Sequence, residues 1–249
     1  MTNPPRTFDL LGTPLLATTY EELTRFAHSL SKGRGTHAID LTNTHIVTLR
    51  RHDSHFREIT SRIDYFVPDG MPLIWCLNAR GAGLRDRVYG PTFMRRCIEA
   101  SPAPWTHYLL GGSAACVAAL RERFDSAQIV GARDGYFSPN DEGAIVAEIN
   151  GLSPDFIWIG LGTPKQQDWI HRHKSALQRG VLLAVGFAFD VNAGLKKDAP
   201  AWMQGAGLTW LFRIGSEPGR LFGRYLRFNS LFLYYLFKDA LTGRPSRHP

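Results

Sequence analysis

The feature that most constrains the fold of this chain is a regular alternation of short apolar runs with longer segments of helical periodicity. Residues expected to form strands are 38–41, 65–67, 108–110, 128–130, 156–159 and 181–185. Helical patterning covers 20–30, 71–78, 92–100, 113–124, 142–149 and 165–177. This alternation predicts an α/β fold, with a mainly parallel sheet covered by helices.

Composition limits the classes of protein that the chain can belong to. A length of 249 residues with 44% apolar content suffices for one sizeable α/β domain, with or without an appendage. The net charge of +7 favours an anionic partner: nucleic acid, lipid headgroup or phosphorylated substrate. Three cysteines without a CxxC pair indicate neither a disulfide framework nor a zinc site. With no signal-peptide pattern at the N-terminus, we expect a cytoplasmic protein.

The composition changes near Gly205, where an aromatic and basic segment begins. From Arg213 onward, seven Lys and Arg against two Asp and Glu give +5 of the total +7. A helix over 219–237 would place Arg220, Arg224 and Arg227 on one face beside an apolar surface, which is typical of a membrane-surface helix. Its longest apolar run, 231–237, is far below the roughly 20 residues that span a bilayer. We therefore expect a core over 1–204 and a basic amphipathic appendage over 205–249, the alternative being an ordinary helix docked on the core.

The loops after the predicted strands hold the first candidate site residues, because ligands bind beyond the carboxyl ends of parallel strands. Asp69 follows one strand and precedes a helix, so it is either a general base or a turn-forming residue. Thr42 and Asn43 follow another strand and offer groups that suit sugar hydroxyls, or cap a helix. His45 belongs to no common zinc motif, and we expect no metal site.

Other strand-end loops suit phosphate. Arg87 precedes a Gly-Pro helix start, and a guanidinium is well matched to a diphosphate unless it is merely solvated. Gly111 and Gly112 lead into a helix whose N-terminus favours a phosphate or nucleotide. Asp134 lies about 20 residues farther on, as in a dinucleotide-binding unit, which keeps a nicotinamide-dependent oxidoreductase open.

The loop after the strand at 156–159 carries the last polar cluster of the core. Its amides and ammonium group could hold sugar or phosphate at the start of a helix, and its candidate residues are Gly162, Lys165, Gln166 and Gln167. Asp190, after the following strand, is compatible with a structural role.

In their order along the chain, these segments resemble the WecG/TagA/CpsF glycosyltransferase family, which builds bacterial cell-surface polymers. The resemblance covers about 38–226 and rests on an ordered series of motifs: Pro68-Asp69-Gly70, Arg87-Val88-Tyr89-Gly90, Leu110-Gly111-Gly112, Asp134-Gly135-Tyr136-Phe137, residues 160–167, and the segment from Arg213 through Glu217-Pro218 to Tyr225.

The resemblance implies a Rossmann-like core with helices on both faces and an inverting, metal-independent transfer from a UDP-sugar to a polyprenyl-diphosphate-linked saccharide. No cofactor is implied beyond the donor. Asp69 would be the base. Thr42, Asn43 and Arg87 would contact substrate, as would an amide from Gln166 or Gln167. The tail residues Arg213, Arg220 and Arg224 would bind diphosphate, lipid headgroups or both, at the inner face of the cytoplasmic membrane.

The sequence departs from the family pattern at three positions: Gln167 replaces a usual Glu, Asp198 a usual Arg, and Thr209 a usual Glu. Besides the transferase, two hypotheses stay open: the nicotinamide-dependent oxidoreductase, and a non-catalytic binder driven by the basic tail. The expected partners are the UDP-sugar, the lipid-linked acceptor and an anionic membrane surface, but no nucleic acid. The resemblance also permits a homo-oligomer formed through the core.

Overall fold

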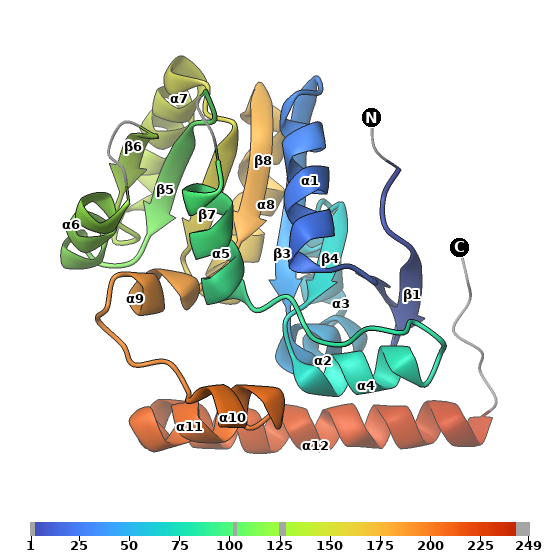
Figure 1. The fold of residues 1–249 in the computed structure, drawn as a ribbon. Coiled ribbons are helices and arrows are strands. Elements are labelled where there is room, and N and C mark those ends of the chain that lie inside the picture. The colour runs from blue at the N-terminus through green and yellow to red at the C-terminus, as the bar shows by residue number, and fades with distance from the viewer. Residues whose placement is uncertain (1–2, 102–103, 125–127, 243–249) are drawn as a thin grey trace.

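The computed structural model describes residues 3–101, 104–124 and 128–242. Their centre is an eight-stranded sheet in the order β1-β2-β4-β3-β8-β7-β5-β6, parallel except for the antiparallel pair β1 and β2 (Figure 1). The strands are β1 (Thr7–Leu10), β2 (Thr13–Leu16), β3 (Gly35–Thr42), β4 (Tyr65–Pro68), β5 (His107–Gly111), β6 (Ile129–Arg133), β7 (Phe156–Gly160) and β8 (Arg179–Ala184). The expected α/β fold with a mainly parallel sheet is confirmed.

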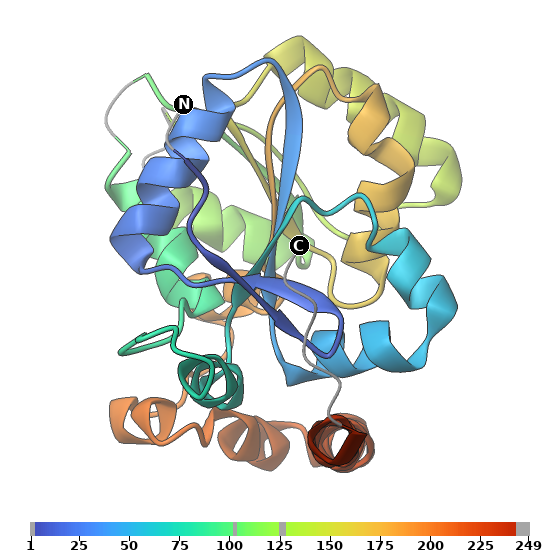
Figure 2. The same ribbon diagram turned by 90° about the vertical axis from the view of Figure 1, so that its right-hand side faces the viewer.

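Helices cover both faces of the sheet (Figures 1 and 2). One apolar cluster joins the sheet to α1 (Tyr20–Ser31), α5 (Gly90–Glu99), α6 (Ala114–Arg123) and α9 (Ala188–Asn192). The other joins it to α2 (Thr44–His52), α4 (Met71–Asn78), α7 (Glu142–Leu152) and α8 (Lys165–His173). A short helix, α3 (Ser54–Ile59), packs beside α2. Because both faces are covered, β7 and β8 are largely apolar, whereas β3 carries the buried polar residues Asp40 and Thr42.

The expected elements are present, but the hairpin of β1 and β2 and the pair α2 and α3 were not predicted. Each strand of the hairpin has four residues, too few for a clear alternation, and Gly12 turns the chain with φ +80°. Of the two roles considered for Asn43, the capping role is confirmed, because its side chain caps α2 by accepting a hydrogen bond from the Ile46 amide. The helix expected over 165–177 ends as a 3₁₀ turn, Lys174–Ala176.

The C-terminal segment forms α10 (Ala201–Gly205), α11 (Thr209–Ser216) and the long α12 (Pro218–Thr242). Figure 1 shows these helices beneath the carboxyl ends of the parallel strands. α12 packs along α2, where Arg51 pairs with Asp239 at 3.0 Å and His52 hydrogen-bonds Tyr235 at 2.8 Å. No helix within the described ranges combines the length and apolarity needed to cross a membrane. The boundary expected at 204/205 falls within α10 and stays a prediction.

Candidate functional site

A cleft of about 730 Å³ lies between the strand-end loops and the C-terminal helices. β3, β4, β7 and β8 bring their carboxyl ends to this edge, and α11 and α12 close the opposite side (Figure 1). Of the side chains and glycines singled out from sequence, the cleft brings together Asn43, Asp69, Gly112, Gly162, Lys165, Gln166, Arg213 and Arg224. Segments up to 181 residues apart in sequence therefore share one site.

Asp69 lines the cleft between β4 and α4. Its backbone amide donates to the Thr42 carbonyl at 2.7 Å, and its Oδ1 accepts a hydrogen bond from the Gly90 amide at 3.3 Å. Burial raises the pKa of Asp69 to about 7, although Arg87, the Gly90 amide and Arg213 each act to lower it. A carboxylate with a pKa near neutrality is suited to accept a proton at physiological pH.

Gln166 contributes a buried amide to the cleft. Its side chain is only 3% exposed, and Oε1 has no hydrogen-bond partner among the described residues. Gly186 leaves room for this amide, because a Cβ added there would lie only 3.3 Å from Oε1. A buried amide oxygen without a partner costs free energy, so a ligand donor such as a hydroxyl or an acylated amine would satisfy it.

The glycine loop after β5 brings backbone close to the cleft. Gly112 has φ +68°, and an added Cβ would meet Cys116 Sγ at 2.7 Å, so a side chain is excluded there. Ser113 caps α6 by accepting from the Cys116 amide. A Cβ added at Gly111 would lie 2.4 Å from the Gly160 carbonyl carbon, so glycine is needed here for the close contact between β5 and β7. Gly112 and Ser113 are therefore the loop residues that a phosphate or nucleoside can approach.

Lys165 and the loop after β6 form one rim of the cleft. Lys165 Nζ donates to the Gly135 carbonyl at 2.8 Å and lies 4.7 Å from the Phe137 ring. Asp134, considered from sequence as a ribose-binding acid, instead accepts from the Tyr136 amide at 2.8 Å and does not line the cleft. The Tyr136 side chain is 84% exposed at the rim, where a planar ligand can reach it.

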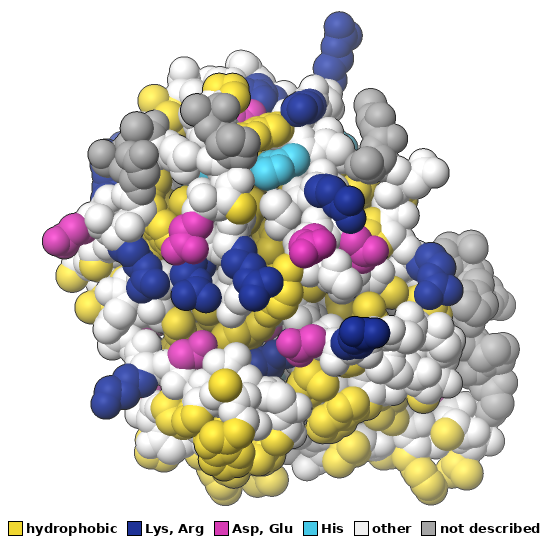
Figure 3. Space-filling model, in the orientation of Figure 1, with side chains coloured by type: hydrophobic (Ala, Val, Ile, Leu, Met, Phe, Trp, Pro, Cys, Tyr) yellow, Lys and Arg dark blue, Asp and Glu magenta, His cyan; other side chains and the backbone are white. Residues whose placement is uncertain are grey.

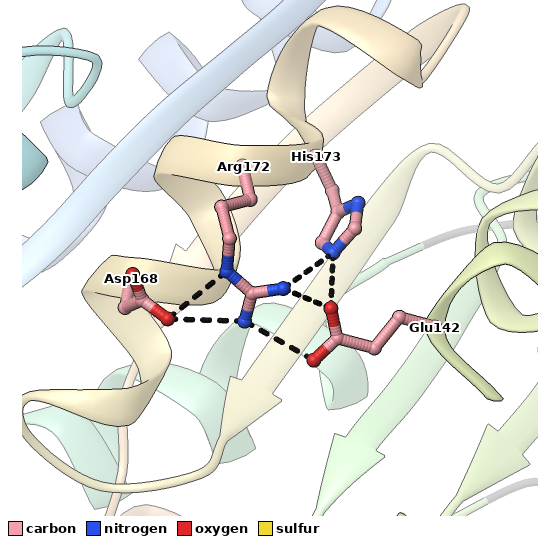
Figure 4. A network of polar contacts seen from close by, with 4 residues as sticks. All are labelled: Glu142, Asp168, Arg172 and His173. Atoms are coloured by element: carbon pink, nitrogen blue, oxygen red, sulfur yellow. Dashed lines mark hydrogen bonds and ion pairs between the residues drawn. The ribbon is translucent and has the colours of Figure 1, made fainter. Parts of the chain in front are cut away.

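A polar network holds α8, the helix that presents Lys165 and Gln166, against α7 (Figure 4). Arg172 binds both Glu142 and Asp168, and His173 Nε2 lies 2.6 Å from Glu142 Oε2. The Glu142 side chain is only 7% exposed, and burial raises its pKa. Hydrogen bonds from Arg172 and His173 outweigh burial, so the pKa lies below its ordinary value. The network holds the C-terminal end of α8, whose first turn lines the cleft, against the start of α7.

Three side chains expected to contact substrate do not line the cleft and are instead hydrogen-bonded within the protein. Thr42 and Gln167 hydrogen-bond a buried carboxylate, that of Asp40. Arg87 is 6% exposed; it donates to the Asp69 carbonyl at 3.3 Å and to Thr209 Oγ1 of α11 at 2.9 Å. Thus Gln166, and not Gln167, presents its amide to the cleft.

The C-terminal helices supply a cationic and aromatic wall. Arg213 stacks on the Phe187 ring with its Cζ 4.0 Å from the ring centroid, and Arg224 lies on the cleft side of α12. The backbone of Arg220 belongs to α12, but its side chain is outside the described part of the structure. Lys196 bridges the two sides of the cleft by pairing with Asp190 at 3.2 Å and with Glu217 at 2.6 Å.

Sequence reasoning missed several residues of this wall. From sequence, the imidazole of His45 belonged to a loop suited to sugar hydroxyls but was not kept as a site residue; in the structure it lines the cleft with its ring edge-on to Phe228, 4.3 Å between centroids. Burial, with Arg224 as the second cause, lowers the pKa of His45 to about 4, so the imidazole is neutral at pH 7. Tyr225 of α12 also lines the cleft. Tyr225 belongs to the basic segment that the sequence had marked, whereas no local pattern placed His45 beside that segment.

The arrangement has the groups needed to transfer a group from a diphosphate to a hydroxyl: a proton acceptor and cations for the diphosphate that leaves. The cleft is lined by a carboxylate whose pKa is raised, by an amide oxygen without a hydrogen-bond partner among the described residues, and by two arginines on the side of the C-terminal helices. No group of three or more His, Cys, Asp or Glu side chains within the described ranges is placed to hold a metal ion.

Comparison with known proteins agrees with this chemistry. Residues 8–246 match the model of the glycosyl transferase WecG/TagA/CpsF family. Among curated proteins, the chain is similar to N-acetylglucosaminyldiphosphoundecaprenol N-acetyl-beta-D-mannosaminyltransferase of Staphylococcus aureus strain MW2, with 26% identity over 237 residues and 92% of each chain covered. The enzymes of that name from strains NCTC 8325 and COL match with the same identity and coverage.

Proposed function

This chain belongs to the WecG/TagA/CpsF family of glycosyltransferases, and from that premise we propose that it moves a hexose, an N-acetylhexosamine or its uronic acid from a UDP-sugar to a polyprenyl-diphosphate-linked saccharide. The transfer inverts the anomeric centre and uses no metal. The observation that carries the proposal is the half-buried Asp69, whose pKa is raised to about 7 inside a cleft walled by Arg213 and Arg224.

In the proposed reaction, Asp69 takes the proton of an acceptor hydroxyl as that oxygen attacks the anomeric carbon of the donor. The bond between the anomeric carbon and the UDP oxygen breaks on the opposite face, so the configuration inverts. UDP leaves with its electron pair, and Arg213 and Arg224 stabilise the charge that develops on the diphosphate. The amide of Gln166 holds the sugar, and Gly112 and Ser113 border the nucleotide.

We place the acceptor on the side of α11 and α12. The relatives' printed names describe a diphosphoundecaprenol acceptor, whose lipid must stay in a membrane while its sugar reaches the cleft. The lower face of the molecule in Figure 3 presents hydrophobic side chains. The exposed ones on the C-terminal helices include Trp202, Leu211, Phe222, Leu226, Leu233 and Phe237. We propose that this lower face rests on the anionic inner leaflet of the cytoplasmic membrane.

The test is UDP release with a panel of UDP-sugars and detergent-solubilised polyprenyl-diphosphate-linked acceptor. Wild type should release UDP only when acceptor is present, and Asp69→Asn should abolish turnover. Asp155→Asn is the matched control, because Asp155 is a half-buried carboxylate that directly precedes β7, at the end of the sheet opposite the cleft, where it accepts from the Thr106 amide. Turnover by Asp69→Asn at near wild-type rate would remove the proposed base.

A further inference from the structure

Asp40 is a fully buried carboxyl group, 0% exposed, that no step of the proposed transfer uses. It lies on β3, two residues before the strand ends. Burying an ionisable group is costly unless hydrogen bonds compensate, so its partners indicate why it is there. Burial raises the pKa of Asp40, and hydrogen bonds from Thr42 and Gln167 oppose that rise.

One oxygen of Asp40 leads to the proposed base. Asp40 Oδ1 accepts from Thr42 Oγ1 at 2.5 Å. The Thr42 carbonyl in turn accepts from the Asp69 amide at 2.7 Å, so three residues form a continuous path from the buried carboxyl to the backbone of Asp69. The conformation at the end of β3 therefore sets the position of Asp69 at the end of the neighbouring β4.

The other oxygen leads to the opposite cleft wall. Asp40 Oδ2 accepts from Gln167 Nε2 at 2.8 Å, and the same amide nitrogen lies 3.3 Å from Thr163 Oγ1. Gln167 adjoins Gln166 in the first turn of α8, and successive helical residues differ by about 100° in direction. When Gln167 is held inward by Asp40, Gln166 is directed into the cleft.

We propose that Asp40 is a positioning residue that sets the distance between the catalytic base Asp69 and the donor-binding amide of Gln166, acting through Thr42 and Gln167. This inference rests on the proposed function of the cleft. It reassigns Thr42 and Gln167 from substrate contacts to links between Asp40 and the two walls. The two links affect different steps, which makes the network testable.

Cutting the Thr42 link should change chemistry more than donor binding. In Thr42→Val the shape of the side chain is kept and its hydroxyl is lost, so the end of β3 that holds the Asp69 amide is no longer tied to Asp40. We expect kcat to fall about tenfold or more, because small misplacements of a catalytic group have effects of this size, with donor KM within about twofold. Thr24→Val is the control, since the Thr24 hydroxyl likewise donates a hydrogen bond, here to the Tyr20 carbonyl, but lies on α1 away from the cleft.

Cutting the Gln167 link should have the reverse pattern. Gln167→Met keeps length and removes the amide, so Gln166 is no longer held and donor KM should rise about fivefold or more, in line with the loss of one buried hydrogen bond. Gln128→Met is the control, because the Gln128 amide likewise donates a hydrogen bond, here to the Ser101 carbonyl, away from the cleft. Donor affinity measured by calorimetry reports this effect without turnover.

Asp40 itself gives the deciding comparison. Asp40→Val should reduce kcat and raise donor KM together. Asp40→Asn should recover most of both, because the Gln167 amide can turn its unpartnered Oε1 toward the new amide while Oδ1 still accepts from Thr42. Thermal unfolding of each variant separates misfolding from mispositioning.

Opposite kcat and KM patterns in folded Thr42→Val and Gln167→Met, with recovery in Asp40→Asn, would support the proposal. Equal effects on kcat and KM in both variants, or no effect in either, would overturn it. If wild type binds the UDP-sugar by calorimetry but transfers it to no acceptor, the proposed function has failed, whereas the Gln167 link is still decided by donor affinity.

Discussion

Replacing Asp69 with Asn should make the protein more stable at neutral pH while it stops turnover. Burial raises the pKa of this carboxyl from its ordinary value of 3.8 to about 7. Between these two pH values the folded protein holds a proton that the unfolded chain has released, so the stability of wild type falls as the pH rises through the window. Asparagine stays neutral and removes this loss.

The size of the effect follows from the two pKa values. A difference of 3.8 to about 7 is worth about 4 kcal/mol at about 1.4 kcal/mol per pH unit. Because Asp69 borders an open cleft, solvent screening reduces this, and we take half, about 2 kcal/mol. For a chain of this length, that corresponds to a Tm higher by about 4–8 °C for Asp69→Asn at pH 8.

The assay is thermal unfolding of wild type and Asp69→Asn at constant ionic strength from pH 4 to pH 8. The two proteins should have nearly equal Tm at pH 4, where Asp69 is protonated, and diverge as the pH rises to 8. In parallel, kcat/KM of wild type should fall about tenfold per pH unit below pH 7, because the base must be ionised. A Tm difference that does not change with pH, or kcat/KM that is flat from pH 5.5 to 8, would refute the raised pKa.

Three further predictions concern α8 and the tail. Glu142→Gln should lower the free energy of unfolding by about 1–3 kcal/mol, since the bonds from Arg172 and His173 are lost. Because the pKa of Glu142 is lowered, this difference in stability between wild type and variant, measured by denaturant unfolding, should be full above pH 4.5 and shrink as the pH falls below it. Phe232→Ala empties a site on α12 that is only 4% exposed, so limited proteolysis should cleave the tail faster and kcat/KM should drop, whereas unchanged proteolysis would argue against docking by this contact. Phe237→Asp alters a side chain that is 66% exposed, so the Tm of the variant should stay within about 2 °C of wild type while its co-sedimentation with anionic vesicles weakens several-fold. Full retention of vesicle binding would count against the lipid-facing lower face.

The membership of the chain in a glycosyltransferase family excludes the oxidoreductase reading, and the structure gives the local reason. The glycine loop after β5 was the basis of that alternative, together with Asp134. In the structure, Asp134 folds back on the Tyr136 amide and stays outside the cleft. A sequence spacing alone does not specify where a side chain points.

The sequence by itself determined the fold class and the edge of the sheet where the site lies. Alternating strands and helices require parallel strands, and parallel strands bring their following loops to one edge, so Asp69 and the loop of Gly162 and Lys165 could be placed together in advance. This works because periodicity and strand direction are local properties of the chain.

Only the tertiary structure decided which polar side chains face the cleft. Gln166 and Gln167 are neighbours with the same chemistry, and a rotation of about 100° between them sends one to the cleft and the other to Asp40. The contact of His45 with Phe228 joins residues 183 positions apart, so no local pattern contained it. Such choices depend on long-range packing, which fixes the direction of each side chain only after the sheet and α12 have come together.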